Sequence, residues 1–305
     1  MDLTQIHHFL VLAETLNFTR AAELCNISQP GLTKSIHRLE AELGGELLYR
    51  ERELTQLTEL GRAMLPLLQQ SYEAAEHAKQ RAHDLRTQDD APVRLGIGAS
   101  ISVAAIAPLV TAVGEQFPQA PFLLSGGTVP ELSDQALHGE LDVLLVPEEE
   151  GLHDRLNRWE LYRQRLAVLL RADDPLAAAA TVPAAALAGR NLITLRGRGG
   201  PLARAADWLR ETAQIELVSM HQADRDAHIQ ALVLGGIGLA LLTDRHLPLA
   251  GLALRPIVEP ELSFPVFLAI VSGRRFTRPA DAFVKLARTR DWGPETGHAA
   301  VSSIP

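Results

Sequence analysis

The chain of 305 residues contains one cysteine, Cys25, so neither an internal disulfide nor a redox switch between two of its own thiols is expected. It has no run of about 18 apolar residues. Its N-terminus, MDLTQIHHFL, lacks the basic and apolar segments of a secretory signal. The sequence therefore predicts a cytoplasmic protein without a membrane span, in which Cys25 is a small buried residue.

Signatures of several enzyme and cofactor classes are also missing. The glycine-rich segments at 96–101 and 236–241 lack the third glycine of the dinucleotide-binding fingerprint. The segment GASIS, residues 98–102, ends in serine where a nucleophile elbow has glycine. The histidines show no spacing typical of zinc ligands. We therefore predict no catalytic residues, no metal site and no cofactor, and a chain that is not an enzyme.

Basic residues are too few to give the chain a positive charge. The net charge is −8, and residues 1–61 hold nine acidic side chains against five basic ones. The total alone argues against a nucleic-acid partner, because affinity for phosphates comes largely from Lys and Arg. The positions of the basic residues, rather than their number, must therefore show whether the chain can bind nucleic acid. Lys34 and Arg38 fall on one face of an expected helix, and Arg50 and Arg52 follow shortly after it.

That helix is predicted from ISQPGLTKSIHRLE, residues 27–40. Ser28 is a favourable N-cap, Pro30 fits a first turn and Gly44 is a favourable stop, so the helix should run over 29–43. At 100° per residue its leucines and isoleucine share one side. The opposite side carries Pro30, Thr33, Lys34, His37 and Arg38. Considered alone, such a polar face is an ordinary solvated surface.

The flanking segments give this face a context. Helices are expected at about 4–15 and from Thr19, whose hydroxyl is the predicted cap of the second. Two short helices joined by a tight turn form the helix-turn-helix arrangement that places a helix in the major groove of DNA. Residues 46–61 then predict a short two-stranded wing that carries Arg50 and Arg52 toward the phosphate backbone.

A long helix is predicted over about 61–86. Its apolar residues recur at steps of three and four, which favours a coiled-coil-like stripe that pairs two chains, although packing on its own second domain is the alternative. Pro66 predicts a kink or a later start. The stripe consists of Leu65, Leu68, Tyr72, Ala75, Ala78, Ala82 and Leu85.

Beyond a polar linker at 87–93, apolar runs alternate with helices. This alternation predicts an α/β fold with mostly parallel sheets. Nearly 200 residues exceed the needs of one such sheet, so two lobes with a cleft between them are expected. The expected strands are 93–97, 121–125, 141–146, 165–170, 191–194, 215–218, 237–242 and 266–271.

The run NFTRAAELCNISQPGLTKSIHRLEAELG, residues 17–44, with LLYR at 47–50 and LTELG at 57–61, resembles the winged helix-turn-helix of LysR-type transcriptional regulators. The segments LDVLL, 141–145, and LGGIGLALL, 234–242, are similar to stretches of that family's effector-binding domain. The resemblance covers essentially the whole chain. Leu48 stands where the family usually has Phe, and Gly31 where Ala is usual, which costs up to about 1 kcal/mol of helix stability.

The resemblance implies an α/β protein with three parts. They are an all-α winged helix-turn-helix, a long linker helix and a two-lobed effector-binding domain like a type 2 periplasmic binding protein. It also implies a homodimer or homotetramer that binds an inverted-repeat operator in double-stranded DNA. Such a regulator would contact RNA polymerase, and a small molecule bound in the interlobe cleft would modulate its activity. The implied bounds are 1–61 for the DNA-binding domain, 62–88 for the linker, 92–163 with 268–298 for lobe I and 164–267 for lobe II.

Individual roles follow from side-chain chemistry. Gln29 and Arg38 suit base edges, and the remaining candidates suit phosphate or positioning contacts, although the wing arginines can instead pair with nearby glutamates. The DNA-binding candidates are Ser28, Gln29, Pro30, Thr33, Lys34, Arg38, Arg50 and Arg52.

For the effector, hydroxyls at strand ends and two arginines predict a site for a small molecule, with an anion as the preferred class. N-capping is the alternative for the hydroxyls, and simple solvation for the arginines. The candidates are Ser100, Ile101, Ser102, Gly127, Thr128, Arg196, Arg198 and His221, with Asp224 beside the last. The alternative function is a solute-binding protein without a DNA role.

Overall fold

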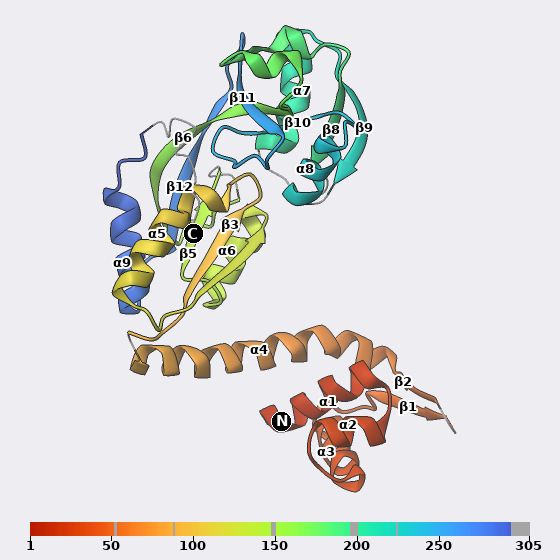
Figure 1. Cartoon of the computed structure of the whole chain (residues 1–305). Coiled ribbons are helices and arrows are strands. Elements are labelled where there is room, and N and C mark those ends of the chain that lie inside the picture. Colours follow the sequence, from red (N-terminus) through yellow and green to blue (C-terminus); the bar gives the residue numbers. More distant parts are fainter. Residues whose placement is uncertain (52–53, 88, 148–150, 196–200, 224, 294–305) are drawn as a thin grey trace, which may run out of the picture. The chain divides into compact units, whose positions relative to one another are not determined.

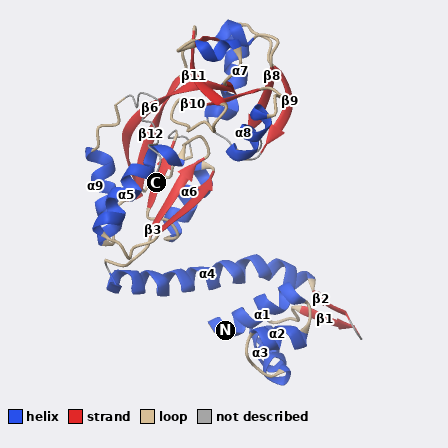
Figure 2. Ribbon diagram, viewed as in Figure 1, coloured by secondary structure: helices blue, strands red, loops and turns tan. Residues whose placement is uncertain are grey.

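The structure, a computed structural model, describes residues 1–305 except 52–53, 88, 148–150, 196–200, 224 and 294–305. It divides into two compact units, Met1–His83 and Asp84–Pro305, and each is described by itself. The first unit is helical apart from one hairpin, and the second combines helices with strands (Figure 2). Within the described residues, no helix is long and apolar enough to cross a membrane.

The first unit packs three helices against a hairpin and the start of a long helix. Fully buried side chains such as Phe9, Leu32 and Leu39 form its core. The expected third helix, wing and long helix are all confirmed. The elements are α1 (Leu3–Thr15), α2 (Phe18–Leu24), α3 (Gln29–Leu43), β1 (Leu48–Glu51), β2 (Leu54–Leu57) and α4 (Glu59–Thr87), which continues past this unit (Figure 1).

Two helix starts differ from the sequence prediction. The Asn17 side chain, not the Thr19 hydroxyl, caps α2, because its Oδ1 accepts hydrogen bonds from the backbone N–H groups of Thr19 and Arg20 at 3.0 Å each. The long helix α4 starts at Glu59, so Pro66 lies inside it and does not delay its start. There the Thr58 hydroxyl accepts a hydrogen bond from the Gly61 N–H at 2.8 Å.

The apolar stripe of α4 has two different environments. Leu68 is buried in the core of the first unit, and Leu65 and Tyr72 pack against that core. Ala78 and Ala82, further along the same stripe, are exposed. The start of the stripe therefore packs on its own chain, and only its later part presents an uncovered face within the unit described.

The second unit is built on a sheet of ten strands with helices on its faces. Its main strand order is β4-β3-β5-β12-β6-β10-β8-β9, with β11 paired to β6 and β7 to β11. Its elements are β3 (Val93–Gly98), α5 (Val103–Gln116), β4 (Phe122–Gly127), α6 (Val129–His138), β5 (Val143–Val146), β6 (Leu156–Arg171), β7 (Val182–Pro183), β8 (Asn191–Leu195), α7 (Pro201–Ala213), β9 (Val218–Ala223), α8 (Asp226–Leu234), β10 (Leu239–Thr243), β11 (Leu252–Val258), β12 (Ser263–Val271) and α9 (Arg278–Thr289), with short 3-10 turns at Pro175–Ala178 and Ala184–Leu187.

The α/β class is confirmed, but the sheet is mixed rather than mostly parallel. Strands β4, β3 and β5 are mutually parallel, as are β10, β8 and β9. The long strand β6 pairs antiparallel first with β12 and then with β10 and β11, so it runs through both halves of the sheet. The strand expected at 215–218 starts only at Val218, and β11 was not predicted.

Each half of this sheet has its own hydrophobic core on both faces. In the first half, α5 and α9 pack on one face and α6 on the other (Figure 1). In the second half, α7 and α8 contribute to separate buried clusters. The buried residues of the two halves meet along β6, between Tyr162 and Leu166.

A buried ion pair ties the end of α4 to the first strand of the sheet. Arg94 Nη1 lies 2.7 Å from Asp84 Oδ2, and the Asp84 side chain is 1% exposed. The Arg94 backbone N–H donates to Asp142 Oδ2 at 3.0 Å. Because one cation lies beside two buried carboxylates, the pair fixes the last turns of α4 against β3.

Candidate DNA-binding surface and effector site

The polar face of α3 is set by its capping and by its buried side. Ser28 Oγ accepts a hydrogen bond from the Gly31 N–H at 3.3 Å, and Gly44 ends the helix in the left-handed conformation with φ of 76°. Leu32, Ile36 and Leu39 are completely buried on the inner side. The predicted bounds of this helix are confirmed, and its outer side is presented to solvent.

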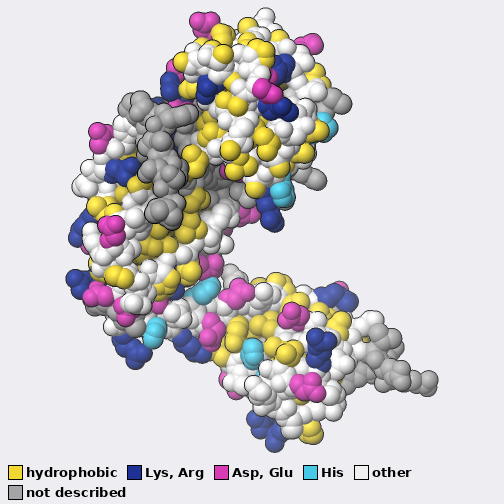
Figure 3. Space-filling model, in the orientation of Figure 1, with side chains coloured by type: hydrophobic (Ala, Val, Ile, Leu, Met, Phe, Trp, Pro, Cys, Tyr) yellow, Lys and Arg dark blue, Asp and Glu magenta, His cyan; other side chains and the backbone are white. Residues whose placement is uncertain are grey.

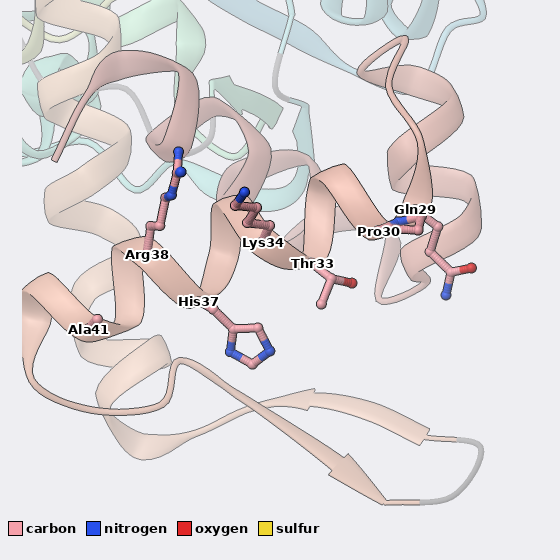
Figure 4. Close-up of a pocket in the computed structure, with 7 residues that line it drawn as sticks. All are labelled: Gln29, Pro30, Thr33, Lys34, His37, Arg38 and Ala41. Atoms are coloured by element: carbon pink, nitrogen blue, oxygen red, sulfur yellow. The ribbon is translucent and has the colours of Figure 1, made fainter.

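A shallow groove runs along that outer side. Gln29, Lys34 and Arg38 are exposed in it, and Thr33 is half-buried. The structure thus brings together five of the eight predicted DNA-binding residues, Ser28 lying just before them. The lining residues all come from α3 and are Gln29, Pro30, Thr33, Lys34, His37, Arg38 and Ala41 (Figure 4).

The charge of the groove differs from that of the unit around it. The visible face of the first unit carries both basic and acidic side chains (Figure 3). In the groove, Lys34 and Arg38 are the formal cations, and no carboxylate of the described residues pairs with either. Two unpaired cations beside an amide and a hydroxyl form a surface suited to phosphates and base edges.

The wing is fastened to both neighbouring helices. Glu40 of α3 accepts a hydrogen bond from the Leu47 N–H at 2.9 Å, and the Thr58 hydroxyl donates to the Glu46 carbonyl oxygen at 2.6 Å. Arg50 lies in β1, opposite Thr55, but its side chain and the whole of Arg52 lie outside the described residues.

The first group of predicted effector residues follows β3. Ser102 Oγ caps α5 by accepting a hydrogen bond from the Ala104 N–H at 3.3 Å, as the capping alternative expects. The Ile101 side chain is buried in the hydrophobic core, so it does not line a site for a small molecule, and its N–H donates to the Gly98 carbonyl oxygen at 3.0 Å. Ser100 is 1% exposed, and within the described part of the chain its hydroxyl oxygen has no hydrogen-bond partner.

The second group, Gly127 and Thr128, follows β4. The Thr128 N–H donates to Glu131 Oε2 at 2.9 Å, and a Cβ added at Gly127 would lie 3.3 Å from the same oxygen. Hydrogen bonds from the Thr128 backbone and hydroxyl lower the pKa of Glu131. An ionised side chain of the protein itself therefore lies at this strand end, which disfavours an external anion there.

Of the remaining effector candidates, the structure describes only His221, in the second half of the sheet. His221 lies in β9, opposite Ile193 of β8. Arg196, Arg198 and Asp224 lie outside the described residues.

Sequence reasoning missed one polar residue beside Ser100. Gln164, in β6 at the passage between the two halves, is fully buried, and its Nε2 donates to the Ser100 carbonyl oxygen at 3.4 Å. Its Oε1 has no partner among the described residues. The available signal was a lone amide beside the apolar run 166–170.

Comparison with known proteins now adds to this geometry. Residues 3–62 match the model of the bacterial regulatory helix-turn-helix protein, lysR family, and residues 86–292 match that of the LysR substrate binding domain. The regulator IlvR of Caulobacter vibrioides is 30% identical over 275 residues, covering 84% of this chain and 92% of IlvR. HcaR of Escherichia coli, the Hca operon transcriptional activator, is 31% identical over 194 residues, covering 64% of this chain and 65% of HcaR.

Solved structures share the fold. The LysR family regulator CbnR has a TM-score of 0.72 at 22% identity, covering 94% of this chain and 98% of CbnR. Full-length CbnR complexed with its target DNA has a TM-score of 0.75 at 22% identity, covering 94% of this chain and 99% of that CbnR chain. Nothing in these similarities favours a solute-binding protein without a DNA role. The chain belongs to the LysR family and is a DNA-binding transcription regulator with an effector-binding domain.

Proposed function

We propose that two or four copies of the chain bind an inverted-repeat operator, with each α3 lying in a major groove. The observation that carries this proposal is the groove on α3, where Lys34 and Arg38, without a carboxylate partner among the described residues, lie beside Gln29 and Thr33. Helices with this arrangement read base edges from their exposed face while neighbouring groups bind phosphates.

Within this surface the roles divide by chemistry. Gln29 and Arg38 have the bidentate groups that match adenine and guanine edges, and the Pro30 ring offers an apolar contact to a thymine methyl group. The other candidates position the helix on phosphates; the Ser28 hydroxyl keeps its proton available because Oγ accepts from Gly31. The positioning set is Ser28, Thr33, Lys34, Arg50 and Arg52.

Self-association through α4 follows from its uncovered stripe. Ala78 and Ala82 are exposed on the face that continues from Leu68, and small side chains allow two helices to approach closely. We propose a dimer along this stripe, and a tetramer as the larger assembly. We also propose a cytoplasmic location and contact with RNA polymerase, as expected for a protein that regulates transcription.

The effector-binding unit is proposed to hold a small molecule between two lobes, residues 92–163 with 268–298 and residues 164–267. Ser100 supports this site because its buried hydroxyl is unsatisfied within the described residues, a state that usually costs free energy. The proposed contacts are Ser100, Ile101 through its backbone, Ser102, Gly127, Thr128, Arg196, Arg198 and His221. An anion remains the preferred class, with its charged group bound by the arginines and an uncharged part of the molecule beside Gly127 and Thr128.

A deletion separates the two activities. Removing residues 1–61 should abolish operator binding measured by DNase footprinting and leave effector binding measured by calorimetry. The three tryptophans, at 159, 208 and 292, all lie in the second unit, so their fluorescence reports whether that unit remains folded. Retention of the footprint by the folded, shortened chain would refute the assignment of DNA binding to the first unit.

A further inference from the structure

His37 is the one titratable ring in the α3 groove, and the proposed roles do not use it. Its side chain is 61% exposed, and its Nδ1 lies 3.3 Å from Glu40 Oε2. The ring projects from α3 on the same side as Thr33 (Figure 4). It therefore lies where a DNA backbone would pass if α3 occupies a major groove.

Glu40 is held in place and cannot turn away from this ring. Its side chain is 10% exposed, and its Oε1 accepts the hydrogen bond from the Leu47 N–H at 2.9 Å, at the start of the wing. One carboxylate oxygen thus binds the wing, and the other faces His37. A carboxylate beside Nδ1 selects the form of the ring in which Nδ1 carries a proton, which leaves Nε2 directed outward.

Among the described residues, the other charged side chains that line the groove are Lys34 and Arg38, and both project away from the His37 ring (Figure 4). The Met1 amino group, just before α1, pairs with Glu42 of α3, and His8 Nδ1 of α1 lies 2.8 Å from Ser35 Oγ.

The second histidine near α3 does not compete with His37. Burial, with a smaller contribution from His7, lowers the pKa of His8. The lowered pKa favours the neutral form of His8, and His8 is not among the described residues that line the groove.

We propose that His37 is a further DNA-contacting residue, and that operator binding takes up a proton at it. In the complex, the imidazolium donates from Nδ1 to Glu40 and from Nε2 to a DNA phosphate, and solvent supplies the proton. The inference rests on the proposed function, since it places α3 on DNA.

The sign of the pH dependence follows from the charges. In the free protein the ring lies beside one carboxylate, that of Glu40, whereas in the complex a phosphate adds a second negative charge beside Nε2. The complex therefore holds the proton more firmly than the free protein does, so affinity is highest at low pH and falls as pH rises. We expect Kd to increase about tenfold between roughly pH 6 and pH 8, and the salt slope to be steeper by about 0.9 per chain at the lower pH.

Calorimetry of the full chain with an operator duplex tests the proton directly. Titrations near pH 7 in two buffers of different ionisation enthalpy give the number of protons taken up per chain. We expect proton uptake by the wild type and none beyond background for His37→Gln. This variant puts an amide, which can form hydrogen bonds but cannot titrate, in place of the imidazole. Thr33→Ala is the matched control, because it removes a groove contact without a titratable group; it should lower affinity and keep the pH dependence.

A second variant distinguishes the charge of Glu40 from its hydrogen bond to the Leu47 N–H. Glu40→Gln retains an oxygen that accepts from the Leu47 N–H but removes the charge beside Nδ1, so proton uptake should fall while the thermal unfolding midpoint of the first unit is retained. Equal uptake by wild type and His37→Gln, with both preferring the operator over a scrambled duplex, would overturn this inference and leave the proposed function intact. Absence of that preference in the wild type would overturn both.

Discussion

Replacing Lys34 with alanine should make operator binding less sensitive to salt. The side chain is exposed on α3 and has no carboxylate partner within the described residues, so its charge is available to DNA. Each phosphate contact contributes about 0.9 to the slope of log affinity against log salt, and a dimer contains two copies of Lys34, which gives a decrease of about 1.8. Over a fourfold salt range, from about 50 to 200 mM, the wild type should therefore lose about 12-fold more affinity than the variant.

Fluorescence anisotropy of a labelled operator duplex across this salt range measures the slope. Lys79→Ala is the matched control: it removes the same charge from α4, where Lys79 Nζ lies 2.7 Å from Glu76 Oε1 and outside the groove. The control should keep the wild-type slope. The same slope for Lys34→Ala and wild type, or the same decrease in both variants, would refute the assignment of Lys34 to a phosphate.

Three further variants test other parts of the account. Gln29→Ala should lose discrimination of about 1–3 kcal/mol at one base pair per half-site, seen in competition with singly substituted operators; a uniform loss on every sequence would contradict base readout. Gln164→Met removes the unsatisfied buried oxygen together with one long hydrogen bond, 3.4 Å, to the Ser100 carbonyl oxygen, so the thermal unfolding midpoint should change little, while the effector-dependent change in operator binding is lost. A variant that unfolds more easily would show that the amide is structural. Asp84→Ala leaves Arg94 with only Asp142, whose Oδ2 lies 3.9 Å from Nη1, and should cost about 3–5 kcal/mol in urea unfolding followed by tryptophan fluorescence. A change under about 1 kcal/mol would contradict a strong buried pair.

Local signals predicted the bounds of α3 well because residues next to its two ends determine them. Ser28 caps α3 and Gly44 stops it through bonds within a few residues, so both bounds can be read from the sequence. The cap of α2 was misassigned because Asn17 and Thr19 are both favourable cap residues two positions apart, and only the backbone shows which one bonds.

The effector-binding unit was predicted in class but less well in detail. The long strand β6 belongs to both halves of the sheet, and its antiparallel pairing with β12 joins residues about 100 positions apart, which no local pattern records. Ser100 could be selected as a candidate because it follows a strand, whereas Gln164 was missed because its contact with Ser100 joins residues 64 positions apart. Glu131 lies at the end of β4 because its side chain accepts a hydrogen bond from the Thr128 N–H. The three-residue spacing permits this capping bond, but the sequence alone does not show that it forms.

The central claim, that α3 carries sequence-specific DNA binding, is tested most directly by affinity for the DNA that flanks the chain's own coding region. Salt-dependent binding of the purified protein should be compared with binding to a scrambled duplex of equal length. We predict protection of an inverted repeat with an affinity at least about 10³-fold above that for the scramble, and loss of this difference when Gln29 and Lys34 are both replaced by alanine. Absence of binding to either duplex at low salt, with or without cell extract as a source of effector, would contradict the claim.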